Sequence, residues 1–230
     1  QHPKEKTDTV TVMERIGHFL DVENERLFQE FKKQGHDNQT ISTLIGEHLD
    51  LQKILIDASR KWDGGYAMAG LIGHGDAFVL RDPNGIRPAY YYYDDEIAVV
   101  TSERPAIQTA FNVSADKIKE IKPGHAVIIR KNGSVEEIEI RKSETRNACS
   151  FERIYFSRGS DAAIYQERKK LGTSLCPAIL QAIENDTRNT VFSYIPNTAE
   201  IAFYGMVKGI EDYLTSVKQR KIMESAATLD

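Results

Sequence analysis

A tight turn near the middle of the chain is spelled Arg81-Asp82-Pro83-Asn84-Gly85-Ile86-Arg87-Pro88. Proline sets φ to about −65°, and the asparagine and glycine that follow it readily adopt left-handed conformations. The backbone should therefore reverse sharply between strands that we expect at 77–80 and 89–93. A second reversal, Lys131-Asn132-Gly133, should join strands at 126–130 and 134–140. The middle third therefore predicts short antiparallel strands.

The flanking thirds have different patterns. Apolar residues at helical spacing predict three helices in the first third, at 21–34, 38–49 and 51–61, with Asp37 as the N-cap of the second. The last third predicts a strand at 151–157, a helix at 162–186 that Pro177 kinks or splits, a buried strand at 191–195 and a helix from 198 to 218. This order is typical of an α/β unit with a parallel sheet, so a domain boundary is expected within 141–150.

Composition excludes several classes of protein. The 230 residues carry a net charge of −4, which gives no basic surplus for binding nucleic acid. The short basic cluster Lys218, Arg220 and Lys221 is better explained as a solvated helix end. Two cysteines are too few for a disulfide framework or a closed zinc site, and a reducing cytoplasm fits them. No apolar run reaches the roughly 18 residues of a membrane span, so no membrane is expected.

Five segments together resemble one family. The turn at 81–88, Ser102-Glu103 and Lys122-Pro123-Gly124-His125 resemble segments of class II glutamine amidotransferases, whose glutaminase domain has the N-terminal-nucleophile fold. The stretches Cys149–Arg158 and Val191–Thr198 narrow the resemblance to the glutamine-dependent phosphoribosyl amidotransferases. The family usually has a proline and a slightly longer loop where this chain has Gly159-Ser160-Asp161, which indicates a divergent subfamily.

The resemblance implies both a fold and a reaction. Residues 1–145 are expected to form an incomplete αββα glutaminase sandwich of the α+β class, and residues 146–230 a linker strand and the start of an α/β phosphoribosyltransferase domain. Family members hydrolyse glutamine with an N-terminal cysteine, and the ammonia displaces pyrophosphate from phosphoribosyl pyrophosphate in the first step of purine synthesis. Because residue 1 is Gln1, the chain is expected to be an internal stretch that carries no catalytic residue and is inactive alone.

Two positions match the family's glutamine site. Asp37 lies where the family has an aspartate that holds the α-amino group of glutamine, a role that is compatible with capping a helix. Gly17 matches the glycine of the family's oxyanion element, although the usual asparagine partner is not evident. Arg81 and Arg87 could clamp a carboxylate, but hydrogen bonds to the carbonyls of the turn are the favoured interpretation.

The resemblance also implies metals. Thr198 lies where the family places a hydroxyl near Mg²⁺-bound pyrophosphate, and its alternative role is a helix N-cap. Cys149 matches one of four ligands of an iron–sulfur cluster in some members; a buried thiol is the simpler interpretation, because a single ligand cannot hold a cluster. The family's main phosphoribosyl-binding loop has no counterpart between Thr198 and Asp230.

Two other functions stay open. Asparagine synthetases and glucosamine-phosphate synthases share the glutaminase turn but carry different synthetic domains. A non-catalytic module that binds a partner or a nucleotide is the alternative from another class. For the favoured family, the expected partners are glutamine and phosphoribosyl pyrophosphate, and a homo-oligomer is expected because an incomplete sandwich exposes a sheet edge.

Overall fold

The computed structural model describes residues 7–143 and 145–227 and divides into two compact units, Gln1–Cys149 and Ser150–Asp230. The expectation for Gln1 concerns a residue outside the described ranges. No described helix combines the length and the apolar character that crossing a bilayer requires.

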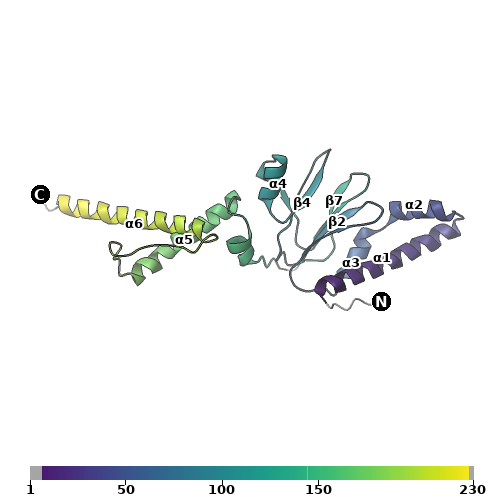
Figure 1. Ribbon diagram of the computed structural model, residues 1–230, viewed down its shortest axis with the longest axis horizontal. Coiled ribbons are helices and arrows are strands. Elements are labelled where there is room, and N and C mark those ends of the chain that lie inside the picture. The colour runs from purple at the N-terminus through teal and green to yellow at the C-terminus, as the bar shows by residue number, and fades with distance from the viewer. Residues whose placement is uncertain (1–6, 144, 228–230) are drawn as a thin grey trace. The chain divides into compact units, whose positions relative to one another are not determined.

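The first unit begins with three helices (Figure 1). They are α1 (Asp8–Lys33), α2 (Asn38–His48) and α3 (Leu51–Ser59). Each begins at a side-chain cap, because Thr7, Asp37 and Asp50 accept hydrogen bonds from backbone N–H groups three residues later. The prediction that Asp37 caps the second helix is therefore confirmed. The first helix begins thirteen residues earlier than the sequence pattern predicted, at Asp8 and not at Asp21.

Seven strands follow in the described part of the chain and form two antiparallel sheets. The four-stranded sheet has the order β1-β2-β6-β7, and the three-stranded sheet has the order β4-β3-β5. Their bounds are β1 (Ala67–Leu71), β2 (Ala77–Arg81), β3 (Tyr90–Tyr93), β4 (Ala98–Thr101), β5 (Lys119–Glu120), β6 (His125–Ile129) and β7 (Val135–Glu139). The expected hairpin about Asn132-Gly133 is confirmed by the pairing of β6 with β7.

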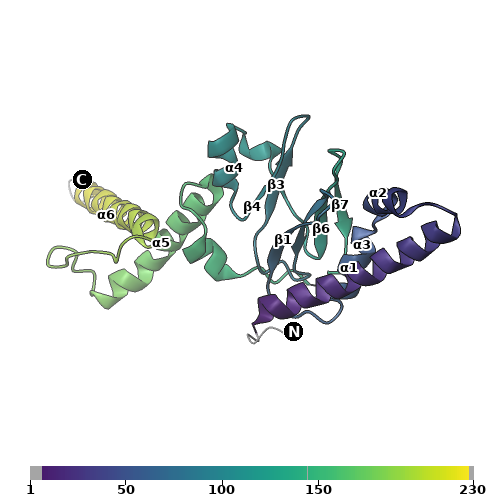
Figure 2. The ribbon, with the colours of Figure 1, turned by 45° about the vertical axis from the view of Figure 1, so that its right-hand side comes forward.

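Two apolar layers hold this unit together. The larger lies between helices α1–α3 and the four-stranded sheet, where Ile41, Leu51, Leu55, Leu80 and Ile128 are fully buried. The smaller lies between the two sheets and contains Tyr91, Ile121 and Val127. Helix α4 (Arg104–Phe111) packs on the three-stranded sheet, so the layers run helices, sheet, sheet, helix (Figures 1 and 2).

The second unit consists of helices in its described part. A short helical segment at Glu152–Phe156 precedes α5 (Ala162–Ala182), and α6 (Glu200–Ala227) packs against α5. The strand predicted at 151–157 is therefore wrong. The buried strand predicted at 191–195 is also wrong, since that segment is a loop in which Val191 is 93% exposed. Pro177 lies inside α5 and does not split it.

Candidate functional site

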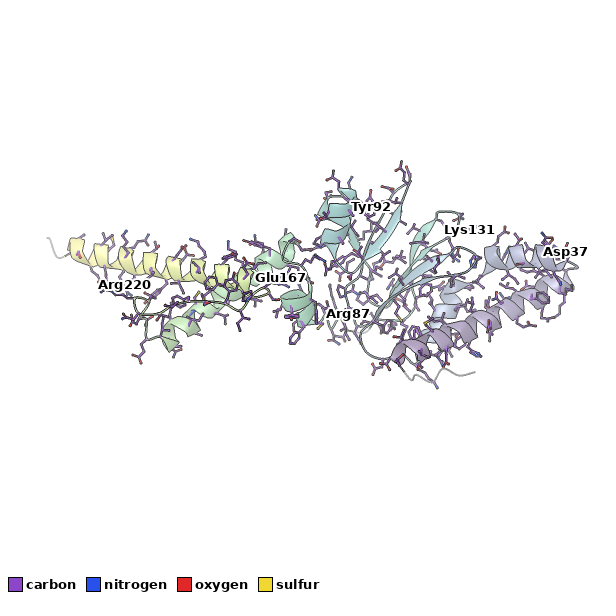
Figure 3. The ribbon with its side chains drawn as sticks, viewed as in Figure 1. Asp37, Arg87, Tyr92, Lys131, Glu167 and Arg220 are labelled. Atoms are coloured by element: carbon purple, nitrogen blue, oxygen red, sulfur yellow. The ribbon has the colours of Figure 1, made fainter. Side chains whose placement is uncertain are left out.

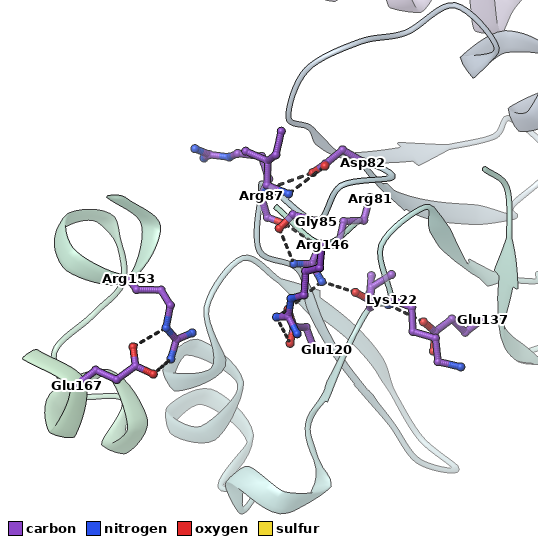
Figure 4. A network of polar contacts seen from close by, with 12 residues as sticks. Arg81, Asp82, Gly85, Arg87, Glu120, Lys122, Glu137, Arg146, Arg153 and Glu167 are labelled. Atoms are coloured by element: carbon purple, nitrogen blue, oxygen red, sulfur yellow. Dashed lines mark hydrogen bonds and ion pairs between the residues drawn. The ribbon is translucent and has the colours of Figure 1, made fainter. Parts of the chain in front are cut away.

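The carboxylate of Asp82 organises the central turn. Asp82 is completely buried, and one of its oxygens accepts hydrogen bonds from the backbone nitrogens of Asn84 (3.1 Å) and Ile86 (2.9 Å). Its other oxygen accepts a hydrogen bond from the backbone nitrogen of Arg87 at 3.0 Å (Figure 4). Gly85 supplies the left-handed position, with φ of +64°. The turn is therefore fixed by a buried side chain as well as by its own backbone.

Arg81 supports the same turn from its other side. Its guanidinium, which is buried, donates to the carbonyl oxygens of Arg87 (2.7 Å) and Gly85 (3.2 Å) and also to that of Ile121. The charge is balanced by Glu120, whose carboxylate oxygen lies 2.8 Å from Nη1. The structural interpretation of Arg81 is confirmed. Arg87 contributes its backbone to the turn, and its side chain is exposed.

The carboxylates of Glu120 and Glu137 link the strands and loops around this turn. Glu120 also pairs with Arg146, 3.0 Å away, which fixes the chain after β7 beside the turn. Glu137 accepts hydrogen bonds from the backbone nitrogen of Lys122 (2.7 Å) and from the hydroxyl of Tyr91 (2.9 Å). Burial and this carboxylate together raise the pKa of Tyr91 well above its ordinary value, so the phenol stays protonated.

A polar cavity of about 1030 Å³ lies elsewhere in the same unit, between the end of α2 and the turns that follow β1 and β6. Buried Asp76 is central to it: its carboxylate binds the backbone nitrogen of Lys131 (2.8 Å), Arg130 (3.1 Å) and His74 (3.2 Å). Burial opposes ionisation of Asp76, but these partners still hold its pKa below the ordinary value. The cavity wall therefore carries charged groups.

The structure separates the predicted glutamine-site residues. Asp37 is exposed at the loop between α1 and α2 (Figure 3). The hydrogen bond from Thr40 lowers the pKa of Asp37, so its carboxylate is ionised at neutral pH. Gly17 lies inside α1, where backbone N–H groups bond to the carbonyl one turn earlier. An oxyanion role for Gly17, which stays a prediction, would require α1 to open.

The predicted metal ligands lie in the second half of the chain. Thr198 is half-buried in the turn before α6, and Cys149 is a half-buried free thiol. Cys176, the other cysteine, is buried between α5 and α6, where its sulfur lies 3.2 Å from the carbonyl oxygen of Met206. Within the described ranges, no group of three or more histidine, cysteine or acidic side chains could hold a metal ion. Neither metal role is tested by this geometry.

The roles of several polar residues could not be read from the sequence. Asp82 was part of a recognised motif, but its burial and its three backbone partners depend on the fold around the turn. Asp76 belongs to the Gly73-His74-Gly75-Asp76 turn, and its partner Arg130 lies 54 positions away. Arg153 and Glu167 of the second unit form another such pair, with a hydrogen bond of 2.6 Å (Figure 4). The local sequence carries no signal for any of these contacts.

Known proteins resemble this chain in fold and in sequence. No protein-family model matches. Two solved structures share the fold: a glutamine phosphoribosylpyrophosphate amidotransferase from B. subtilis in complex with ADP and GMP (TM-score 0.54, 22% identity, 81% of this chain and 41% of that chain), and the allosteric regulatory enzyme of purine biosynthesis (TM-score 0.55, 23% identity, 82% and 41%). This chain therefore shares the fold of about two fifths of each of these proteins.

Sequence similarity to curated proteins indicates more specifically which proteins this chain resembles. The chain is 29% identical over 197 residues to the amidophosphoribosyltransferase of Archaeoglobus fulgidus. The aligned region covers 81% of this chain and 40% of that protein. Identity is 32% over 147 residues with the Saccharomyces cerevisiae enzyme (59% and 28%) and 30% over 171 residues with that of Haemophilus influenzae (68% and 33%). The chain is similar to amidophosphoribosyltransferases along 59 to 81% of its length in these three comparisons. It spans 28 to 40% of the length of these three relatives.

Proposed function

We propose that this chain contributes to a glutamine-dependent amidophosphoribosyltransferase. The reaction takes nitrogen from glutamine as ammonia, which displaces pyrophosphate from C1 of phosphoribosyl pyrophosphate to give phosphoribosylamine. The observation that carries this proposal is similarity along up to 81% of the chain to proteins named for this activity. The layered first unit and its buried turn are compatible with a glutaminase domain, and the second unit corresponds to the beginning of a phosphoribosyltransferase domain.

Asp37 is proposed to bind the α-ammonium group of glutamine. Its carboxylate is exposed and ionised, and it is held in place because it caps α2 by accepting a hydrogen bond of 2.8 Å from the Thr40 backbone nitrogen. A charge-assisted hydrogen bond to an ammonium group is stronger than a hydrogen bond between neutral groups. Asp37 would therefore contribute to glutamine affinity while leaving the chemistry on phosphoribosyl pyrophosphate unaffected.

A matched pair of variants tests this role in the natural protein. Asp37→Asn removes the charge but keeps a good N-cap, so the stability of α2 should change little. Asp50→Asn makes the same change at the cap of α3, where Asp50 accepts a hydrogen bond of 2.9 Å from the Lys53 backbone nitrogen. Both carboxylates are exposed. Asp50 lines the polar cavity, whereas Asp37 lies outside it and is the residue proposed to contact glutamine.

The measurement is phosphoribosylamine formation with glutamine and, separately, with ammonium chloride as nitrogen donor. We expect Asp37→Asn to raise KM for glutamine about tenfold or more and to leave the ammonia-dependent rate unchanged. Asp50→Asn should leave both unchanged. An unchanged KM for glutamine in Asp37→Asn would exclude the role of Asp37, and equal effects of the two variants would indicate a change in folding only.

The candidate ligands Thr198 and Cys149 do not form a complete site for either metal that the family resemblance implies. An iron–sulfur cluster needs four ligands, and the two cysteines of the chain include Cys176, which is already buried between two helices. Thr198 offers a single hydroxyl oxygen, whereas Mg²⁺ in such sites is bound through carboxylates and substrate phosphates. Thr198 and Cys149 could each supply one ligand at most, so no step of the reaction is assigned to a metal here.

A further inference from the structure

The connecting segment, residues 141–149, joins the two units and is anchored where it begins. The backbone nitrogen of Arg141 donates a hydrogen bond of 2.9 Å to the carbonyl oxygen of Gly124. The guanidinium of Arg141 donates to the carbonyl oxygens of Ser59 (3.3 Å) and Trp62 (2.5 Å). Arg141 is therefore held in the first unit by both its backbone and its side chain.

Gly124 allows this segment to lie close to the central turn. Its φ is +72°, and a Cβ atom on it would lie 2.0 Å from the carbonyl oxygen of Arg141. The same Cβ atom would lie 3.5 Å from the α-carbon of Pro83, and the Gly124 nitrogen donates a hydrogen bond of 2.9 Å to the carbonyl oxygen of Asp82. A side chain does not fit at this position, so the glycine brings the connecting segment and the central turn together.

A second anchor holds the connecting segment near its other end. The Asn147 nitrogen donates a hydrogen bond of 2.8 Å to the carbonyl oxygen of Asn84 in the central turn. Nη2 of Arg146 lies 3.0 Å from one carboxylate oxygen of Glu120 and 3.3 Å from the other (Figure 4). Glu120 is itself held 2.8 Å from the buried guanidinium of Arg81. We call the contacts of Arg146 and Asn147 the clamp.

The clamp determines how much of the connecting segment is free. The second unit begins at Ser150, so with the clamp closed residues 148–149 separate it from a fixed point. An extended chain spans about 3.5 Å per residue, so this tether reaches about 7 Å. With the clamp open, the nearest fixed point is Arg141, and the tether of residues 142–149 reaches about 28 Å. The local concentration of one unit around the other falls roughly as the −3/2 power of tether length, here about eightfold.

We propose that the clamp couples glutamine hydrolysis to phosphoribosylamine formation by keeping this tether short, with Arg146 as a positioning residue. The inference rests on the proposed function, in which one domain releases ammonia from glutamine and another consumes it. Ammonia that is not captured diffuses into water, and a longer tether gives it more opportunity to escape. Opening the clamp should therefore release glutamate without a matching amount of pyrophosphate, while the transfer of added ammonia continues.

Charge reversal at the clamp tests this role in the natural protein. Arg146→Glu places a second carboxylate beside Glu120. The control Arg60→Glu makes the same change on α3, where Asp57 lies 2.7 Å from Arg60. Arg146→Lys keeps the positive charge. We expect the pyrophosphate released per glutamate to fall at least about twofold in Arg146→Glu and to stay unchanged in Arg146→Lys and Arg60→Glu. The rate with ammonium chloride as nitrogen donor should be unchanged in every variant.

Hydrogen exchange of the connecting segment tests the clamp independently of activity. Peptides that cover residues 142–149 should exchange at least about fivefold faster in Arg146→Glu than in the native protein, and at the native rate in Arg60→Glu. Unchanged exchange in Arg146→Glu would overturn the clamp. Faster exchange with pyrophosphate and glutamate still released in the native ratio would overturn its coupling role. If the native protein releases no pyrophosphate with either nitrogen donor, the proposed function fails and the coupling role with it, whereas the exchange rates still decide whether the clamp exists.

Discussion

The carboxylate of Asp82 lies 3.0 Å from the backbone nitrogen of Arg87, and this hydrogen bond closes the turn at residues 81–88. Replacing Asp82 with alanine would leave the N–H groups of Asn84, Ile86 and Arg87 without their acceptor inside the protein. Each buried group that loses its partner costs about 1 to 3 kcal/mol, so we expect the free energy of unfolding to fall by about 3 kcal/mol or more. Urea denaturation of the chain measures this loss.

Asp94 is the matched control for Asp82. Its carboxylate also accepts two backbone hydrogen bonds, from Glu96 and Ile97, each of 2.9 Å, but it is fully exposed to water. Water can replace those bonds, so Asp94→Ala should lower the free energy of unfolding much less than Asp82→Ala does. Similar losses in the two variants would show that burial of Asp82 does not determine the stability of the turn.

Close packing of α5 and α6 gives a second prediction. A Cβ atom on Gly205 would lie 1.9 Å from the carbonyl oxygen of Lys169, so Gly205→Ala should force the helices apart and lower the protection of both against hydrogen exchange. Gly17 of α1 has no atom within 4 Å of the same position, so Gly17→Ala should stabilise its helix by about 0.5 to 1 kcal/mol. If α5 and α6 are as well protected against hydrogen exchange in Gly205→Ala as in the native chain, the close packing of the two helices is contradicted.

Glu23 gives a pH-dependent prediction. A hydrogen bond from Arg26 lowers its pKa below the ordinary value of 4.5 against the opposing effect of burial, and Lys53, 2.8 Å away, lowers it further. Because the pKa is lower in the folded state, ionised Glu23 stabilises the fold above pH 4.5, and this stabilisation disappears as pH falls through the folded-state pKa. Glu23→Gln should therefore destabilise at pH 7 and much less near pH 3.

Unfolding free energies of the native chain and Glu23→Gln, measured between pH 3 and pH 7, test this dependence. Glu30→Gln is the control, because Glu30 also pairs with Arg26 (2.9 Å) but is half exposed. It should change stability by less than about 1 kcal/mol. A difference between native chain and Glu23→Gln that is constant across this pH range would contradict the linkage.

Local turn chemistry explains why the strands of the first unit could be predicted. Asn132-Gly133 demands a reversal, and the apolar stretches on either side of it pair as β6 and β7. The sequence around Pro83 also demands a reversal, but the strands on either side of it, β2 and β3, belong to different sheets. Of the two residues offered as left-handed in the turn at 83–85, only Gly85 has positive φ. The buried carboxylate of Asp82 determines which conformation is adopted, and that requires the fold.

The second unit shows where sequence patterns fail. Short apolar runs at 151–157 and 191–195 were predicted as strands, but a strand needs a neighbour to satisfy its backbone groups, and the described residues from 150 onward contain none. The first run forms a helical segment and the second a loop, with Ile195 84% exposed. Among the candidate sites, only the capping role of Asp37 followed from local sequence. The cavity around Asp76 depends on contacts between distant turns.

Pyrophosphate release by the natural protein from phosphoribosyl pyrophosphate, with glutamine as nitrogen donor, tests the proposed transferase activity. We expect pyrophosphate and glutamate in equal amounts, together with a glutamine-independent rate when ammonia is supplied at high pH. Failure to release pyrophosphate with either nitrogen donor would contradict it.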